Sequence, residues 1–382
     1  SEVEQKLQCL FPERYLSAGS WKKEIGEGLH GCASAGGIRV KRLLNTLYVT
    51  SPNRYLSLDG ENVVISEKNE EVGRVPLHNL EMIVTFGYTG ASPALMGACA
   101  SRNVGLVFLS GNGRFIARVV GEVYGNVTLR KEQYRRSEQK EESLAIAKNC
   151  IIGKVYNSRW ILERAARDYS MRLDAEKLRS KSGFLASSLT KIRNCRSASE
   201  LLGLEGEAAS VYFSVFDDLI LQKKEDFHFT GRNRRPPTDE VNAMLSFAYT
   251  LLTSMCASAL ETVGLDPYVG FFHTDKPGRK SLALDLVEEL RSVMADRFVL
   301  TQINLKTIRK DGFTKKENGA VVMDDNTRKI FLTAWQKKKQ EMITHPFLEE
   351  KVEWGMVPFV QAMLLARHLR GDLEEYPPFF WK

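Results

Sequence analysis

The stretch YLSLDGENVVI, residues 55–65, decides the first half of the fold. Its first four residues alternate in polarity, Asp59-Gly60 is typical of a hairpin turn, and residues 62–65 return as a second strand. Further strands are predicted at residues 43–50, 74–77, 82–86, 105–109 and 115–120. One helix interrupts them, because Ser92 suits an N-cap and Pro93 the first helical position. It should end near Arg102.

The pattern changes after Gly125. Apolar residues now recur at helical spacing, as at Leu144, Ala147, Ile151 and Val155, and nearly every segment to about residue 370 reads as helix. We therefore predict an α+β fold: a small β-rich domain at 41–125, then a larger all-α domain at 126–382. Residues 1–40, which are rich in glycine, are expected to form an extension outside this fold. The aromatic tail 376–381 contains two prolines and should pack on the body without forming a helix.

The composition narrows the class of protein. A net charge of +7, from 54 Lys and Arg against 47 Asp and Glu, permits a polyanionic partner. No two of the six cysteines form a C-x-x-C pair, which argues against a structural zinc or iron–sulfur site and favours reduced core thiols in a cytosol. We find no apolar run of the roughly 20 residues that a membrane span needs. The sequence therefore predicts a cytoplasmic protein without a membrane anchor.

Candidate metal ligands stand in residues 270–291 and around Glu205. His273 precedes a Pro-Gly turn, and Asp285 and Glu288 are three apart on the helix that follows, so they share one face. Glu205 lies between Gly203 and Gly206, where we expect a tightly packed helix start. Two carboxylates and an imidazole suit Mg²⁺ or Mn²⁺.

Structural roles explain the same residues equally simply. His273 could be an ordinary structural histidine, the acids could form the solvated face of an amphipathic helix, and Glu205 could serve the helix dipole. Spacing alone favours these structural roles, because residues 205 and 273–288 lie far apart in the chain.

Basic residues gather at several places in the helical half. Each cluster alone could be a solvated face, but together they favour a track for a phosphate backbone, with sequence-tolerant binding. The clusters are residues 130–140, 223–235, 306–316 and 337–339.

Five segments in combination resemble the CRISPR-associated integrase of spacer acquisition, the universal adaptation enzyme of those systems. They are residues 43–50 (LLNTLYVT), 88–96 (YTGASPALM), Glu205-Gly206, 234–247 (RRPPTDEVNAMLSF) and the pattern G-F-x-H…S-L…D-L-x-E over 270–288. The resemblance covers about 41–382 and is greatest to the subtype I-C branch. It implies a metal site formed by Glu205, His273 and Glu288, with Asp285 as an auxiliary acid. Arg234, Arg235 and Asn242 are weaker candidates for DNA contacts or loop organisation near the site.

The resemblance also implies partners and a reaction. The β domain would form a homodimer, a small ferredoxin-like CRISPR-associated protein would join it, and an iron–sulfur nuclease would trim the incoming double-stranded DNA. We therefore expect a metal-dependent DNA integrase that inserts short fragments, the spacers, into a repeat array. In this reaction a 3′-hydroxyl attacks a phosphodiester directly. A structure-selective metal-dependent endonuclease is one alternative, and a non-catalytic DNA-binding scaffold is another.

Overall fold

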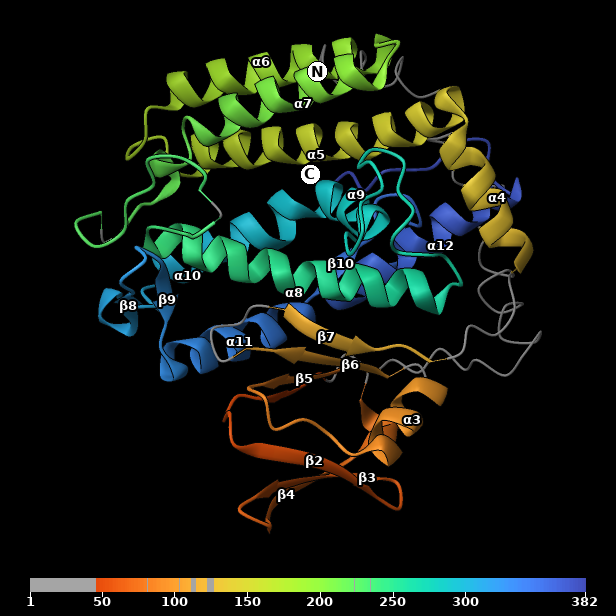
Figure 1. Cartoon of the computed structure of the whole chain (residues 1–382). Coiled ribbons are helices and arrows are strands. Elements are labelled where there is room, and N and C mark those ends of the chain that lie inside the picture. The colour runs from red at the N-terminus through yellow and green to blue at the C-terminus, as the bar shows by residue number, and fades with distance from the viewer. Residues whose placement is uncertain are drawn as a thin grey trace.

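The computed structural model describes residues 46–80, 82–102, 104–110, 115–121, 127–222, 224–233 and 235–382. The predicted extension at 1–40 and the first residues of the strand predicted at 43–50 lie outside these ranges. Figure 1 shows a small β-rich part below a larger helical part, as the α+β prediction requires.

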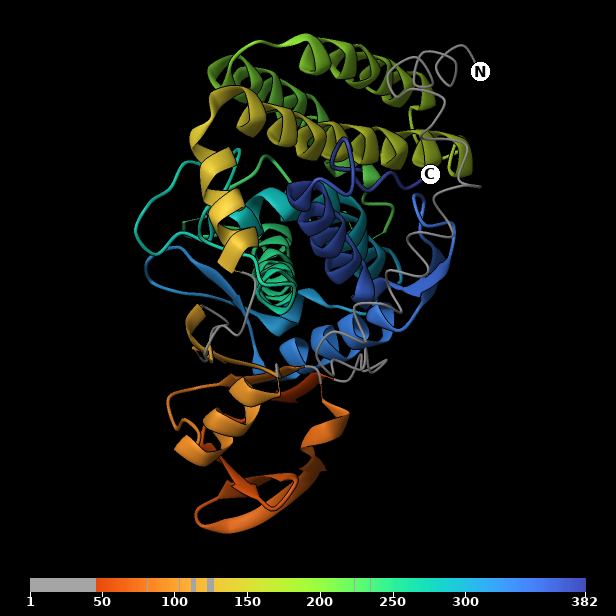
Figure 2. The same ribbon diagram turned by 90° about the vertical axis from the view of Figure 1, so that its right-hand side faces the viewer.

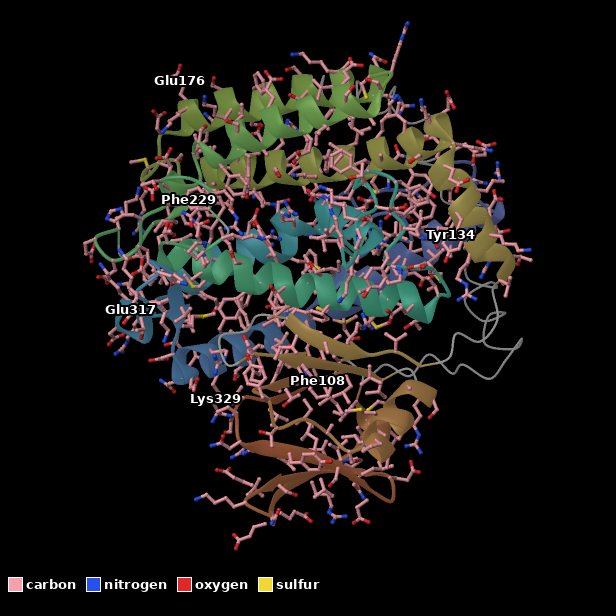
Figure 3. All side chains as sticks on the ribbon, in the orientation of Figure 1. Phe108, Tyr134, Glu176, Phe229, Glu317 and Lys329 are labelled. Atoms are coloured by element: carbon pink, nitrogen blue, oxygen red, sulfur yellow. The ribbon has the colours of Figure 1, made fainter. Side chains whose placement is uncertain are left out.

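The β-rich part consists of two sheets with one helix. The four-stranded sheet has the order β1-β5-β6-β7 and the three-stranded antiparallel sheet the order β2-β3-β4. The strands are β1 (Thr46–Val49), β2 (Arg54–Asp59), β3 (Asn62–Glu67), β4 (Glu70–Pro76), β5 (Met82–Phe86), β6 (Gly105–Leu109) and β7 (Phe115–Val119). Apolar side chains from both sheets and from α3 (Pro93–Ser101) form one core. Phe108 lies between the sheets in Figure 3 and packs against this core.

Local signals predicted this part well. Asp59 pairs with Asn62, so the hairpin loop is Gly60-Glu61, and Gly60 has the positive φ of 56° that such a loop demands. Ser92 caps α3 by accepting a hydrogen bond from the N–H of Leu95 at 3.2 Å. The strand predicted at 74–77 is the end of the longer β4.

The helical part contains nine α-helices within the described residues. They are α4 (Val127–Glu138), α5 (Lys140–Asp168), α6 (Ala175–Asn194), α7 (Ala198–Phe213), α8 (Glu240–Thr262), α9 (Ser281–Leu290), α10 (Arg297–Asn304), α11 (Asp325–Lys339) and α12 (Val357–Arg370). One π-helical segment, Arg291–Asp296, joins α9 to α10. Short 3₁₀ turns lie at Leu77–Asn79, Asp217–Leu219, Lys310–Gly312 and Trp354–Met356.

The prediction of an all-α second part was too simple. Two short antiparallel hairpins interrupt it, β8 (Phe313–Lys315) with β9 (Val321–Met323), and β10 (Met342–Thr344) with β11 (Lys351–Glu353). Each strand has only three residues, which is too few for an alternating pattern to be recognised in the sequence.

Helix α8 forms the centre of the helical part. It is seen nearly end-on in Figure 2, surrounded by other elements. It is long and apolar enough to cross a membrane, which our reading of the sequence missed, yet 72% of its most apolar window is buried inside the fold. Burial among α9, α12 and the π-helical segment explains its composition as that of a core helix.

The two parts are joined by polar contacts as well as by packing. On β7, Arg118 forms an ion pair with Glu261 near the end of α8, and its Nη2 also donates to Ser258 Oγ at 3.2 Å. Lys339 of α11 is buried and its Nζ donates to Thr46 Oγ1 of β1 at 2.8 Å. Figure 1 shows the four-stranded sheet lying against α11 and α8 at this junction.

The tail packs on the body, as predicted. Phe379 is fully buried, and its N–H donates to Glu289 Oε2 at 2.7 Å. Asn157 of α5 donates to the carbonyl of Phe379 at 2.7 Å and accepts from the N–H of Trp381 at 2.8 Å. The tail therefore forms a buried layer against α5 and α9.

Candidate metal centre

Glu205 lies in the middle of α7 and not at a helix start. Ser197 caps this helix by accepting from the N–H of Glu200 at 3.2 Å, so Glu205 comes two turns later. The helix-dipole interpretation is therefore wrong. A Cβ added at Gly203 or Gly206 would meet nothing within 4 Å, so these glycines leave an open surface beside Glu205 and not a tight contact.

His273 is held by Asp285. Its ring Nδ1 lies 2.6 Å from Asp285 Oδ1, and its backbone N–H donates to the same oxygen at 2.9 Å. The other oxygen of Asp285 accepts from the backbone N–H groups of Phe271 and Phe272 at 2.6 and 3.0 Å. When Nδ1 carries the proton, Nε2 is left as the electron-pair donor, which is the usual arrangement behind a metal-bound histidine.

These contacts separate the roles of the two acids on α9. Asp285 is completely buried, and within the described residues its hydrogen bonds go to the loop at 271–273. Asp285 therefore holds the loop and the ring of His273 in place, as an auxiliary acid would. Ser281 is the first residue of α9 and donates through Oγ to the Thr274 carbonyl at 3.1 Å.

Glu288 lies in a strongly cationic environment. Arg291 Nη2 is 2.6 Å from its Oε1, and Lys154 Nζ is 2.7 Å from its Oε2. Burial alone would raise the pKa of Glu288, but Arg291, Lys154 and His273 outweigh it and lower the pKa to about 2. Glu288 is therefore ionised at neutral pH, although only 4% of its side chain is exposed.

Lys154 connects the two distant carboxylates. Its Nζ forms an ion pair with Glu205 Oε1 on α7 as well as with Glu288 on α9. Across the described ranges, no three His, Cys, Asp or Glu side chains converge closely enough to enclose one ion. The structure thus brings Glu205 and Glu288 together on one ammonium group, and the charge of Glu288 is also influenced by His273.

Lys154 and Arg291 are residues of this site that were not predicted from the sequence. The signal for Arg291 was its place three residues after Glu288, which puts the two on one helical face. The signal for Lys154 was a single charged residue in the apolar run Cys150–Tyr156, of a type that is almost never buried without a partner.

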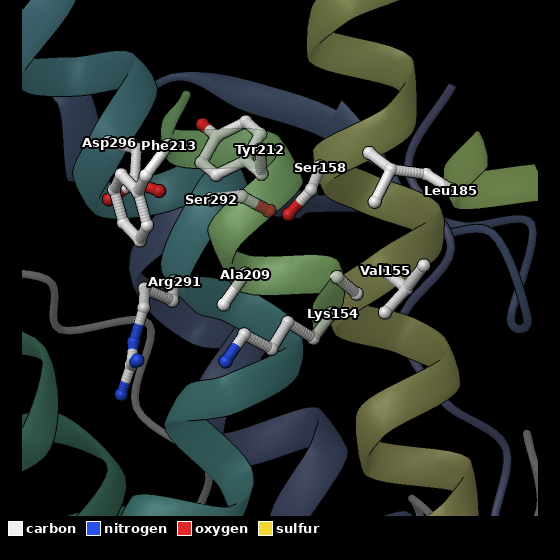
Figure 4. Close-up of a pocket in the computed structure, with 11 residues that line it drawn as sticks. Lys154, Val155, Ser158, Leu185, Ala209, Tyr212, Phe213, Arg291, Ser292 and Asp296 are labelled. Atoms are coloured by element: carbon white, nitrogen blue, oxygen red, sulfur yellow. The ribbon is translucent and has the colours of Figure 1, made fainter. Parts of the chain in front are cut away.

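A small cavity lies behind Lys154. Its volume is about 10 Å³, the size of one water molecule. Figure 4 shows Lys154 and Arg291 at one end, and Tyr212 and Asp296 at the other. Burial raises the pKa of Asp296 to about 6, and Tyr249 donates a hydrogen bond to it.

The three weaker candidates fall in different places. Arg234 lies outside the described residues, and Arg235 is exposed. Asn242 is completely buried. Its Nδ2 donates to the Gly231 carbonyl at 2.9 Å and its Oδ1 accepts from Arg232 at 2.6 Å. Asn242 is therefore not open to direct DNA contact here, and its geometry supports the organisation of the loop before α8.

The basic clusters also differ from one another. Arg135 and Arg136 form ion pairs with Glu132 and Glu142, which neutralise much of their charge. In the cluster at 337–339, Lys339 is buried, and Lys338 forms an ion pair with Glu341.

By contrast, the basic residues of the 306–316 cluster are exposed, and no ion pair involving them occurs among the residues that the structure describes. They are Lys306, Arg309, Lys310, Lys315 and Lys316. Figure 3 places Glu317, which follows this cluster, at the outer end of the β8–β9 hairpin. The 306–316 cluster is thus an exposed cationic surface of the helical part.

Comparisons with known proteins identify the family of the chain. Residues 47–337 match the model of the family described as CRISPR associated protein Cas1. The chain is 52% identical over 347 residues to a CRISPR-associated endonuclease Cas1 of Rhodospirillum rubrum, covering 90% of this chain and all of that one. It is 47% identical over 343 residues to one of Chlorobaculum tepidum, again covering 90% of this chain and all of the other.

Solved structures show the same fold at lower identity. A casposase bound to integration product has a TM-score of 0.76 at 24% identity, covering 88% of this chain and 94% of that chain. A Cas1 protein from Thermotoga maritima has a TM-score of 0.74 at 21% identity, covering 88% and 100%. With a family model matched over most of its length and full-length relatives near 50% identity, the chain belongs to the Cas1 family of CRISPR-associated proteins.

Proposed function

We propose that this protein is a metal-dependent DNA integrase that inserts short DNA fragments into a CRISPR repeat array. One observation carries the proposal: Glu205 and Glu288, from helices far apart in the chain, share a single ammonium group beside a histidine whose ring is fixed by Asp285. Carboxylates drawn together in a largely buried place need positive charge beside them, and acids held in this way are suited to bind a divalent ion.

The residues fit a divalent ion. Glu288 Oε2 is buried and has no hydrogen bond of good geometry, although Lys154 lies within ion-pair distance. Glu205 and Glu288 would supply carboxylate oxygens and His273 an imidazole nitrogen, a donor chemistry that suits Mg²⁺ and, because of the imidazole, Mn²⁺ even better. Once bound, such an ion supplies charge stabilisation to a reacting phosphate and its leaving oxygen.

The protein's own groups provide the rest of the chemistry. The reaction is an exchange: the 3′-oxygen of the incoming strand forms a bond to a repeat phosphorus, and the bond from that phosphorus to the repeat's own 3′-oxygen breaks. The proton of the attacking hydroxyl passes to solvent, and the released 3′-oxygen takes one up. Arg291, held between Glu288 and the Tyr249 ring, contributes a fixed positive charge that favours the phosphorane-like transition state. In this scheme His273 is a neutral ligand and not the general base.

The surface near Glu205 suits a DNA strand. Gly203 and Gly206 leave no side chain to obstruct a backbone that lies along α7. The exposed 306–316 cluster and Arg235 supply positive charge for sequence-independent phosphate contacts.

Joining of strands is favoured over hydrolysis alone. A casposase with this fold has been described bound to an integration product, which supports transesterification. The curated relatives are named endonucleases, so a structure-selective nuclease remains the nearest alternative. The same site would then use water in place of the 3′-hydroxyl.

We further propose a cytoplasmic assembly of the subtype I-C kind. Residues 41–125 would form the homodimer, and residues 126–382 would carry the catalytic site. A structure of a related fold is described as a Cas6-RT-Cas1–Cas2 complex, which supports a small ferredoxin-like partner. A Geobacter sulfurreducens relative, 36% identical, is a Cas4 exonuclease/Cas1 endonuclease fusion, which supports the iron–sulfur trimming nuclease as a further partner.

The test is a strand-transfer reaction. The protein and its small partner are incubated with a 3′-hydroxyl duplex and a supercoiled repeat plasmid, with and without Mn²⁺. We expect joined product only with the ion, and none from Glu205→Gln. Glu207→Gln, which changes an exposed acid on the same helix, is the matched control and should join at the wild-type rate.

The outcomes separate the candidate functions. Nicks without joined product would favour the endonuclease. DNA binding without any cleavage, in wild type and Glu205→Gln alike, would favour the scaffold and count against the metal centre.

A further inference from the structure

Lys154 stands where the proposed centre needs a cation, and its place in the fold is unusual. The side chain is only 8% exposed and projects from α5, so two helices other than its own supply its carboxylate partners. Gly153, the preceding residue, permits this close approach: a Cβ there would lie 2.8 Å from Glu289 Cβ on α9. Close packing of α5 against α9 therefore places the ammonium group between the two carboxylates.

The same oxygens serve the proposed donor set. Lys154 Nζ contacts Glu205 Oε1 and lies 2.7 Å from Glu288 Oε2. The remaining Glu288 oxygen, Oε1, is bound by Arg291, which also packs on the Tyr249 ring. Because Arg291 has a second site of attachment and Lys154 does not, Lys154 is the more readily exchanged of the two cations.

We propose that Lys154 and the divalent ion are alternative counter-ions of Glu205 and Glu288, so that binding of the ion displaces the Lys154 ammonium group. This inference rests on the proposed metal-dependent function and assigns a positioning residue to it. Both cations cannot share the same two oxygens, since like charges at such separations repel strongly in a buried site.

The fold provides a place for the displaced group. Lys154 lines the cavity of about 10 Å³, and Asp296 at its far end offsets the charge of Arg291, which also lines it. Ser292 also lines it, and its buried Oγ has no hydrogen-bond partner among the described residues. That hydroxyl can accept a hydrogen bond from the ammonium, and Figure 4 shows it on the π-helical segment facing α5.

A metal titration tests the exchange without measuring activity. Mn²⁺ binding is followed by calorimetry, and the melting temperature is recorded with and without Mn²⁺, for wild type, Lys154→Met and Lys154→Arg. Lys154→Met removes the competing charge, so its Kd for Mn²⁺ should fall by about tenfold. Its melting temperature should drop without Mn²⁺ and rise more than that of wild type when Mn²⁺ is added. Lys154→Arg keeps a competing cation and should bind Mn²⁺ like wild type.

Lys148→Met is the matched control. Lys148 lies on the same helix, but its Nζ donates to the carbonyl of Arg193 at 3.1 Å and not to these carboxylates. Its Kd and its Mn²⁺-induced shift in melting temperature should equal those of wild type. If Lys154→Met does not fold, Lys154→Gln, whose amide still hydrogen-bonds to the carboxylates, takes its place in the same titration.

The possible failures are distinguishable. An unchanged or higher Kd in the neutral Lys154 variants, with wild type binding Mn²⁺ normally, would overturn the exchange and leave the proposed function standing. Absence of Mn²⁺ binding by wild type itself would overturn the metal centre and the exchange together.

Discussion

One oxygen of Asp285, Oδ1, binds both the ring Nδ1 and the backbone N–H of His273, at 2.6 and 2.9 Å. The aspartate thus fixes the position of the loop and the rotation of the imidazole at the same time. A histidine can bind a metal ion only when the lone pair of its ring nitrogen points at the ion. Orienting the proposed ligand His273 therefore gives a reason for a completely buried acid one turn before Glu288.

Asp285→Asn should weaken metal binding while leaving all three proposed ligands in the chain. An amide has one acceptor oxygen and cannot serve all four donors, so the ring of His273 loses its orientation. We expect a loss of about 10–100-fold in Mn²⁺ affinity, measured by calorimetry. Asp275→Asn, at an exposed acid of the same loop, is the control, and equal affinities for the two variants would contradict the orienting role.

Gly270→Ala should disturb the loop at 271–273 by a steric clash with Asp285 and Ser281. A Cβ there would meet Asp285 Oδ2 at 2.8 Å and the Ser281 backbone carbon at 2.9 Å, so the loop or α9 must shift. We expect the free energy of unfolding to fall by about 1–3 kcal/mol in urea denaturation.

The same substitution at Gly203 should have the opposite effect. A Cβ there meets nothing within 4 Å, and Ala is the better residue in a helix interior, so Gly203→Ala should gain about 0.5–1 kcal/mol. A loss of stability in both variants would show that α7 is not as open beside Glu205 as the structure indicates.

Arg118→Met should loosen the junction between the sheet and α8. The Arg118 side chain is 6% exposed, and removing it leaves Glu261 partly buried without its ion-pair partner. A cost of about 3–5 kcal/mol in the free energy of unfolding is expected, by denaturant titration. Arg74→Met is the comparison, because its ion pairs with Asp59 and Glu71 are exposed and screened by solvent, so its loss should change the free energy of unfolding far less.

His345 should make the fold sensitive to acid. It is completely buried, its Nδ1 accepts from the N–H groups of Phe347 and Leu348 at 3.3 Å, and burial lowers the pKa of His345 to about 4. The unfolded chain takes up this proton near pH 6.5 and the folded chain only near pH 4. Stability is therefore complete above pH 6.5 and falls as the pH drops from 6.5 to 4, by on the order of 3 kcal/mol.

An NMR titration of the ring and unfolding at pH 7 and 4.5 would check this. His345→Gln should lose less stability than wild type between the two pH values. His228→Gln, at an exposed histidine, controls for the loss of a histidine as such. A ring that titrates near pH 6.5 would contradict the prediction.

The sequence predicted those features that short local patterns encode. Alternation and the Asp-Gly turn at 55–65 gave the first hairpin, and Ser92 with Pro93 gave the start of α3. Glycines on either side of Glu205 are typical of a helix boundary, so a helix start was predicted there. In the structure these glycines lie inside α7 and leave its surface free of side chains.

Contacts between distant segments could not be predicted in this way. Helical periodicity predicted Asp285 and Glu288 as equally good ligands. Only the structure shows that the oxygens of Asp285 already accept hydrogen bonds from N–H groups of the 271–273 loop. Lys154 carries no motif at all, since its role depends on carboxylates 51 and 134 residues further along the chain (205 − 154 and 288 − 154).

The buried tail has a consequence for how the protein is made. Glu289, the neighbour of Glu288, receives the N–H of Phe379, and Asn157 on the Lys154 helix receives that of Trp381. Residues 376–381 are translated almost a hundred residues after α9. A nascent chain on the ribosome therefore lacks the layer that holds α5 against α9, and a chain stalled before this point should have a loosely formed centre. Vectorial synthesis would thus delay the appearance of a DNA-cutting site until the chain is long enough to fold around it.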